Sequence, residues 1–155
     1  MKTVNVCDFF SSPIGLGHVT RDIAVVNNLK DIPINFVTGS GAAKILEKLE
    51  FKVNDAYNPP SFSVKEGILN NQTKWLWNYY QYYKNCKNTS EKILKKNNSN
   101  LIISDEDFAS LTVAQNLEIP NILITDVLET KFTKGIASFI EKKNEQVNDE
   151  HCKKL

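Results

Sequence analysis

A glycine-containing stretch at residues 11–22 (SSPIGLGHVTRD) constrains the fold of this chain more than any other feature. An apolar run, Val4 to Phe10, precedes it, and an amphipathic run, Val19 to Leu29, follows it. This order predicts a strand, a tight turn and the start of a helix. Glycines in such a turn let the backbone approach a ligand, and the first turn of the helix presents unpaired N–H groups to anions or oxygen-rich ligands. The stretch is therefore the first candidate site.

Strands and helices are predicted to alternate along the rest of the chain. The apolar runs predict strands over 2–10, 34–38, 51–54, 101–104 and 121–125. Residues at helical spacing predict helices over 17–30, 42–49, 66–97, from 104–107 to Leu117, and over 130–147. This order indicates an α/β fold, a Rossmann-like doubly wound and mostly parallel sheet of at least five strands with helices on both faces. Ligands of such sheets bind beyond the carboxyl ends of the strands, here at 11–21, 39–41 and 104–107.

Length, charge and cysteine spacing exclude several classes of protein. The 155 residues predict a single domain over 1–147 with a polar tail at 148–155. A net charge of +1 argues against nucleic acid as a partner, and no apolar run has the roughly 18 residues of a membrane span. Three widely spaced cysteines indicate neither a disulfide framework nor a zinc site, so a cytoplasmic setting is expected. Asp105, Glu106 and Asp107 are adjacent rather than spaced as a ligand set, so no metal is predicted.

Two nucleotide-binding motifs fit the glycine stretch poorly. Gly15-x-Gly17-x-x-Thr20 lacks the third glycine of the dinucleotide fingerprint, and the second predicted strand ends in Thr38-Gly39-Ser40 without an acid to hold a ribose. A phosphate-binding P-loop is excluded because no Gly-Lys-Ser/Thr follows. A dinucleotide-binding protein is therefore the least favoured alternative.

Three segments carry a resemblance to a known enzyme class. The run from Gly15 to Ala24 (GLGHVTRDIA) resembles the first loop and helix of two-domain GT-B glycosyltransferases, both the family-1-like and the family-28-like groups, which include the peptidoglycan N-acetylglucosaminyltransferase. Residues 101–105 (LIISD) with the following Ile119-Pro120 resemble a later block of the same N-terminal domain. Residues 38–41 (TGSG) resemble the turn after its second strand. The resemblance as a whole covers most of residues 1–126.

The resemblance implies roles for particular residues. Sugar transfer needs a base for the acceptor hydroxyl, and an imidazole, here His18, suits that role. In several family-1 enzymes the loop histidine pairs with the aspartate after the fourth strand, which corresponds to Asp105. The remaining candidates shape an acceptor or phosphate pocket: Gly15, Gly17, Thr20, Arg21, Gly39 and Ser40. Arg21 would either face a phosphate or anchor the loop.

The resemblance also implies a component that this sequence does not carry. Enzymes of this class bind the nucleotide-sugar donor, which is a substrate and not a cofactor, mainly through a second, C-terminal domain. We therefore expect a split or truncated enzyme that is inactive without a second domain or subunit. The expected partner is a separate donor-binding subunit or a second copy of the chain in a homo-oligomer. The alternative is a non-catalytic ligand-binding or assembly module of the same fold. A separate, structural alternative for the two residues is that His18 caps its helix and Asp105 is an N-cap or first-turn acid.

An aromatic window, Trp75 to Tyr83 (WLWNYYQYY), lies in the long predicted helix. It holds more aromatic rings than one buried face needs. Trp75, Trp77 and Tyr80 are therefore candidates for a subunit interface or a wall of the acceptor site, while burial at a domain edge is the simpler alternative. Lysines beside these rings are also compatible with peripheral contact with a membrane.

Overall fold

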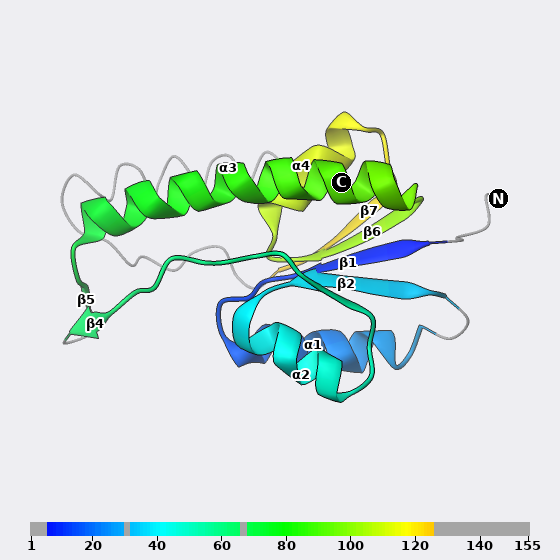
Figure 1. The fold of residues 1–155 in the computed structure, drawn as a ribbon, viewed down its shortest axis with the longest axis horizontal. Coiled ribbons are helices and arrows are strands. Elements are labelled where there is room, and N and C mark those ends of the chain that lie inside the picture. The colour runs from blue at the N-terminus through cyan, green and yellow to red at the C-terminus, as the bar shows by residue number, and fades with distance from the viewer. Residues whose placement is uncertain (1–5, 30–31, 66–67, 126–155) are drawn as a thin grey trace.

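The computed structural model describes residues 6–29, 32–65 and 68–125, and its core is a parallel sheet of five strands (Figure 1). The strand order is β3-β2-β1-β6-β7. The strands are β1 (Cys7–Ser11), β2 (Ile34–Thr38), β3 (Val53–Asp55), β6 (Leu101–Asp105) and β7 (Asn121–Ile124). Every pairing in this sheet is parallel. The Rossmann-like α/β prediction is therefore confirmed.

Helices cover both faces of the sheet (Figure 1). Helices α1 (Leu16–Val26) and α2 (Ser40–Lys48) lie on one face, and α3 (Gln72–Asn97) and α4 (Phe108–Asn116) lie on the other. Successive side chains of a strand point to opposite faces, so Phe9 packs with the first pair of helices and Phe10 with the second. Both rings are fully buried, and burying one stabilises the fold by about 2–3 kcal/mol.

The register of the strands brings several polar residues to one edge of the sheet. Ser11 at the end of β1 lies opposite Asp105 at the end of β6, and Thr38 lies opposite Asp55 at the ends of β2 and β3. The Ser12 N–H donates to the Asp105 carbonyl oxygen at 3.1 Å, which ties the loop after β1 to β6. The loop before α1 and the turn before α4 therefore meet at this edge.

Some element boundaries differ from the sequence prediction. Helix α1 ends at Val26 rather than at residue 30, because Asn27 and Asn28 form a turn. The predicted helix over 66–97 begins only at Gln72 and is preceded by an antiparallel hairpin of β4 (Val64–Lys65) and β5 (Ile68–Leu69), which the sequence analysis missed. The predicted helix over 42–49 runs from Ser40 to Lys48, so it ends one residue before Leu49, which is exposed.

A charged residue lies in the central strand. Asp8 is fully buried and accepts hydrogen bonds from Asn35 Nδ2 at 3.1 Å, Asn97 Nδ2 at 2.9 Å and the Ser99 hydroxyl. These donors satisfy a carboxylate that burial alone would strongly destabilise. Asp8 therefore joins β1 to β2 and to the end of α3, a structural role that its place in an apolar run concealed.

Other predictions fall outside the described residues. They are the helix over 130–147, the tail at 148–155 and the start of the first strand at 2–5. Within the described ranges, no helix combines the length and the apolar character needed to cross a bilayer.

Candidate functional site

The glycine stretch forms the loop between β1 and α1, as predicted. Gly15 is the residue before the helix and has φ +89°, a conformation that residues with a Cβ rarely adopt. Gly17 is the second residue of α1, and a Cβ placed on it would meet no atom of the described residues within 4 Å. The Thr20 hydroxyl donates to the carbonyl oxygen of Leu16 at 2.6 Å, so it is engaged with its own helix. The glycine positions at the start of α1 are thus uncrowded by the described residues, and His18 and Arg21 follow within the first two turns of this helix.

The structure brings His18, Arg21 and Asp105 together. The Asp105 carboxylate is fully buried at the end of β6. Arg21 donates to it twice, from Nε to Oδ2 at 3.1 Å and from Nη2 to Oδ1 at 2.5 Å. His18 Nδ1 lies 3.3 Å from Asp105 Oδ1 and 3.2 Å from Arg21 Nη2. Arg21 therefore anchors the loop on Asp105, the second of the two roles considered for it.

The protonation of His18 determines which of these neighbours its ring engages. A proton on Nδ1 would be donated to Asp105 and would leave the lone pair of Nε2 available. A proton on Nε2 would instead point toward Glu106, whose Oε2 lies 3.5 Å away, while Nδ1 accepted from Arg21. Asp105 and Arg21 thus favour opposite tautomers of one imidazole.

Neither His18 nor Asp105 serves as a helix cap. The residue that caps α1 is Gly15, with no side-chain cap bond. The residue that caps α4 is Asp107, whose Oδ1 accepts from the Ala109 N–H at 3.2 Å. The alternative in which both residues simply cap helices is therefore wrong.

Asp22 is a polar residue of this region that the sequence analysis did not single out. It lies one helical turn after His18 and is fully buried on α1. Neither of its oxygens makes a hydrogen bond of good geometry within the described part of the chain. Burial, and then the nearby Asp105, raise the pKa of its carboxyl to about 8, against the opposing effects of Ser11 and Arg21. Its signal was a charged residue spaced three and four positions from Val19 and Val26 on the buried stripe.

Gly39 and Ser40 lie at the end of β2 and the start of α2. A Cβ on Gly39 would lie 1.7 Å from the Tyr57 carbonyl oxygen, so close packing alone accounts for glycine there. The Ser40 N–H donates to Asp55 Oδ1 at 3.2 Å. A Cβ on Gly41 would lie 3.6 Å from the Leu16 side chain, which places this turn beside the start of α1.

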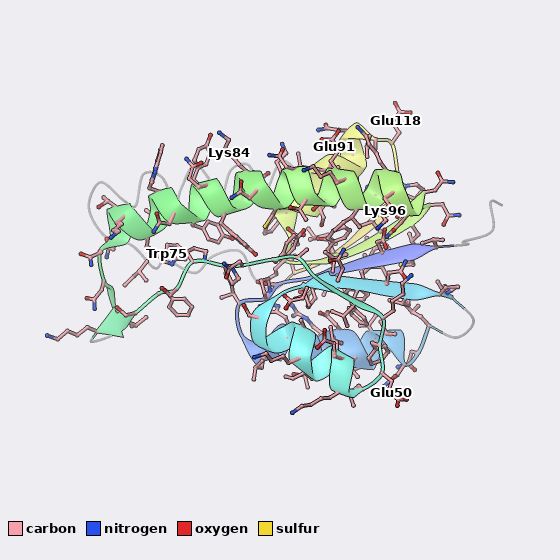
Figure 2. The ribbon with its side chains drawn as sticks, in the orientation of Figure 1. Glu50, Trp75, Lys84, Glu91, Lys96 and Glu118 are labelled. Carbon is pink, nitrogen blue, oxygen red and sulfur yellow. The ribbon has the colours of Figure 1, made fainter. Side chains whose placement is uncertain are left out.

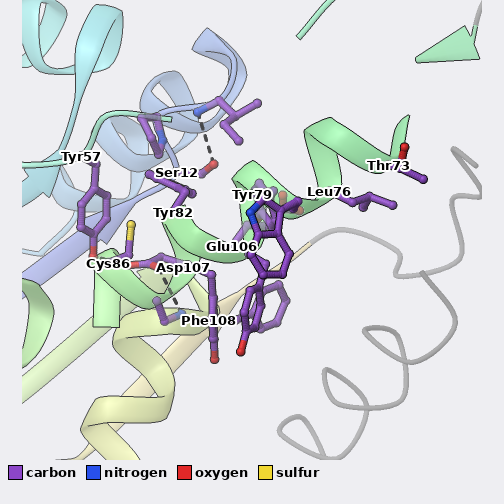
Figure 3. A pocket seen from close by; sticks show the side chains of 16 residues that line it. Ser12, Tyr57, Thr73, Leu76, Tyr79, Tyr82, Cys86, Glu106, Asp107 and Phe108 are labelled. Atoms are coloured by element: carbon purple, nitrogen blue, oxygen red, sulfur yellow. Dashed lines mark hydrogen bonds between the residues drawn. The ribbon is translucent and has the colours of Figure 1, made fainter. Parts of the chain in front are cut away.

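A cavity of about 520 Å³ opens between the loop after β1, helix α3 and the start of α4 (Figure 3). Ser12, Pro13 and Ile14 form its edge toward His18, and Glu106 lines the cavity while also approaching the His18 ring. The other lining side chains are mostly apolar or aromatic: Tyr57, Thr73, Leu76, Trp77, Tyr79, Tyr80, Tyr82, Tyr83, Cys86, Asp107, Phe108 and Ala109. Figure 3 shows Tyr57, Cys86 and Asp107 at one end, with Thr73 and Leu76 at the other.

The aromatic window divides between this cavity and the surface. Trp77 and Tyr80 line the cavity and remain 63% and 50% exposed, with ring centroids 6.0 Å apart. Trp75 is half-buried and stacks on Tyr79 at 5.0 Å instead of lining the cavity. Figure 2 places Trp75 on the side of α3 toward the extended segment before β4, with Lys84 and Glu91 on the outer side.

The inner end of the cavity is polar and buried. Asp107 Oδ2 accepts from the Tyr57 hydroxyl at 2.7 Å, and the same hydroxyl lies 2.8 Å from the Ser90 hydroxyl. Burial raises the pKa of the Asp107 carboxyl above its ordinary value, although hydrogen bonds from Tyr57, Ser110 and Ala109 oppose the shift. Burial also raises the pKa of the Tyr79 phenol to about 12, so this ring is neutral at physiological pH.

Metal coordination has no support in the described ranges. They contain no group of three or more His, Cys, Asp or Glu side chains arranged to hold an ion. The only acids that line the cavity among these residues, Glu106 and Asp107, are neighbours in sequence.

Solved structures share this fold. No family model and no curated protein matches the sequence. The glycotransferase of kitacinnamycin superposes with a TM-score of 0.65 at 10% identity, over 96% of this chain and 36% of its own. MurG of Acinetobacter baumannii superposes with a TM-score of 0.53 at 11% identity, over 91% of this chain and 39% of its own. The chain thus spans little more than a third of the length of these glycosyltransferases.

A structure of another class is also similar. The C-terminal domain of the PF1911 hydrogenase of Pyrococcus furiosus gives a TM-score of 0.54 at 14% identity, over 80% of this chain and 94% of that domain. At such identities these likenesses show the fold alone. The chain has the fold of one half of a GT-B glycosyltransferase, a fold that it also shares with this hydrogenase domain.

Proposed function

We propose that this chain is the acceptor-binding half of a glycosyltransferase, which moves a sugar from a nucleotide-sugar donor to an acceptor hydroxyl. The observation that carries the proposal is the His18–Asp105–Arg21 cluster beside an apolar cavity at the carboxyl edge of the sheet. In α/β folds this edge is where ligands bind. A cavity with a titratable side chain at its margin is also the usual setting of a reaction site.

The proposed chemistry uses His18 as the base. With the Nδ1 proton donated to Asp105, Nε2 takes the proton of the acceptor hydroxyl as its oxygen attacks the anomeric carbon of the donor. The new C–O bond forms while the bond from the sugar to the nucleoside diphosphate breaks, and the diphosphate leaves with the bonding electron pair. Asp105 holds the required tautomer and stabilises the imidazolium that forms.

Arg21 and Glu106 adjust this arrangement. Because Arg21 binds both oxygens of Asp105, it fixes the carboxylate in position while offsetting part of its charge. Glu106, 3.5 Å from Nε2, lies where it can attract either the protonated ring or the acceptor hydroxyl. We assign the donor to a second domain or subunit, as the resemblance of the sequence implies.

The test is a transfer assay on the tagged chain purified from its own host with any protein that accompanies it. The preparation is incubated with a panel of nucleotide sugars, and released nucleoside diphosphate and glycosylated products are measured by mass spectrometry. Sugar transfer by a complex containing this chain would support the proposal. Absence of diphosphate release with every donor, from a complex that is folded and complete, would leave the non-catalytic binding module as the better account.

A further inference from the structure

The cavity beside His18 has an unusual balance of charge. Its lining includes the two acids Glu106 and Asp107 and, within the described residues, no lysine or arginine. Arg21, which is nearby, donates to Asp105 and does not line the cavity. Among the described lining residues, the side chains that can carry a charge at neutral pH are therefore acids.

Aromatic rings surround the same space at steep angles to one another. The Tyr57 and Tyr82 rings are 6.2 Å apart with an interplanar angle of 80°, and the Tyr79 and Tyr82 rings are 5.8 Å apart at 47°. The face of an aromatic ring carries negative electrostatic potential, so a cation that enters the cavity is attracted to the ring faces that line it. Lys84 illustrates this attraction outside the lining, where its Nζ lies 5.4 Å from the centroid of the Tyr80 ring.

Asp107 is positioned to complete such a site at the buried end. Its Oδ2 accepts from the Tyr57 hydroxyl and its Oδ1 from the Ala109 N–H, and hydrogen bonds from Ser110 also favour its charged form. Glu106 supplies the second carboxyl nearer to His18. The Tyr57 and Tyr82 phenols have pKa values raised by burial, so they add no charge of their own at neutral pH.

We propose that this cavity binds an organic cation, a molecule with a flat apolar body and a protonated or quaternary amine, held by the ring faces together with Asp107 and Glu106. Its identification as the acceptor of sugar transfer rests on the proposed function, whereas its binding does not. A neutral molecule of the same shape would fill the cavity without engaging the carboxyls, and an anion would be repelled by them.

The experiment compares three probes that differ in charge. Phenethylamine, 2-phenylethanol and phenylacetate share a ring and a similar chain length and carry charges of about +1, 0 and −1 at pH 7. Each is titrated into the full chain while tryptophan fluorescence is excited at 295 nm, since Trp77 lines the cavity. We expect the amine to bind about tenfold more tightly than the alcohol and the anion to bind most weakly.

Two variants test whether the preference for the amine over the alcohol arises in the cavity. Asp107→Asn keeps an effective N-cap on α4 while removing the carboxylate, and it should reduce the amine-to-alcohol ratio several-fold. The matched control is Glu47→Gln on the exposed side of α2, which makes the same change in net charge on the other face of the sheet and should leave the ratio unchanged. Far-UV circular dichroism confirms that both variants fold.

The outcomes separate this proposal from the proposed function. Equal binding of amine and alcohol, or an amine preference that Asp107→Asn leaves intact, would overturn the organic-cation site and leave sugar transfer unaffected. Failure of all three probes to bind would overturn it as well. Selective amine binding by a chain that transfers no sugar would retain the site and reject the enzyme.

Discussion

Arg21 is the only arginine in the chain, and its contact with Asp105 explains why arginine is suited to this position. Its guanidinium, 31% exposed, binds both oxygens of a fully buried carboxylate. Two parallel N–H···O bonds of this kind match the geometry of arginine and not of lysine. The residue therefore serves first to hold Asp105, and through Asp105 the ring of His18.

Replacing Arg21 by methionine should destabilise the protein by about 3 kcal/mol, because Asp105 would remain buried without its main partner. The double variant Arg21→Met with Asp105→Asn should recover most of that loss, since it also removes the charge. Urea unfolding followed by circular dichroism measures both values. Equal stability of the single variant and the wild type would mean that this ion pair does not hold the site together.

The raised pKa of the Asp22 carboxyl should make the free energy of unfolding depend on pH. Its carboxyl has a pKa of about 8 in the folded protein, above the value of about 3.9 expected when unfolded. The folded state therefore binds more protons, so the stability contributed by this group is fully present below about pH 4 and is lost as pH rises through 8.

The matched variant is Asp22→Asn, which resembles the protonated side chain at every pH. Its stability relative to wild type should increase between pH 5 and pH 8, by at most about 1.4 kcal/mol per pH unit. Denaturant midpoints at pH 5, 6, 7 and 8 provide the comparison. A difference between the two proteins that stays constant over this range would contradict the raised pKa.

Some contacts of the candidate site could be predicted from the sequence, and others could not. The pairing of His18 with Asp105 could be anticipated, because the sequence places both residues at the carboxyl ends of predicted strands, and these strands are neighbours in the sheet. The contact of Glu106 with His18 could not, since it depends on a backbone φ of +51° at Glu106 that no motif announces. Asp22 was overlooked because its helix pattern was read for apolar residues only.

At the scale of elements, two glycines near the starts of α1 and α2 should have opposite effects on stability when replaced by alanine. Gly39→Ala would force a Cβ against the Tyr57 carbonyl oxygen, so the fold should lose about 2 kcal/mol or more. Gly17→Ala adds a methyl group in open space within α1 and should stabilise the helix by up to about 1 kcal/mol. Thermal unfolding of the two variants tests the contrast, and a stable Gly39→Ala protein would show that the close approach to Tyr57 relaxes readily.

The C-terminal half of α3 packs in the core, and its N-terminal half lines the cavity. Its C-terminal half buries Cys86, Ser90, Ile93 and Leu94 against the sheet, whereas its N-terminal half carries the cavity-lining rings. Leu94→Ala should therefore destabilise the fold by about 2–5 kcal/mol. Trp77→Ala, at a residue 63% exposed, should leave the unfolding midpoint nearly unchanged while weakening binding in the cavity. Similar destabilisation by both would mean that Trp77 is part of the core.

Elements with strong apolar patterns were predictable, and those without were not. β2 was placed at its observed bounds and β6 within one residue, because both follow turn residues and hold buried apolar side chains. The hairpin of β4 and β5 was missed because each strand contains two residues, and those of β4 are exposed. The cavity depends on how α3 crosses the start of α4, which tertiary packing alone determines.

At the scale of the whole molecule, the fold does not decide the function. The same sheet and helices resemble parts of glycosyltransferases and a hydrogenase domain at 10–14% identity. Function in such folds resides in the site and not in the scaffold. The assignment to sugar transfer therefore depends on what His18 does.

The most direct test of this account is the rate of sugar transfer by the complex that contains this chain, compared between wild type and His18→Ala. The variant should bind the cavity probe phenethylamine as the wild type does, because His18 does not line the cavity. We predict that it loses transfer by about 100-fold or more, the contribution of a positioned general base. Transfer at the wild-type rate by a folded His18→Ala protein would contradict the role of this cluster in catalysis.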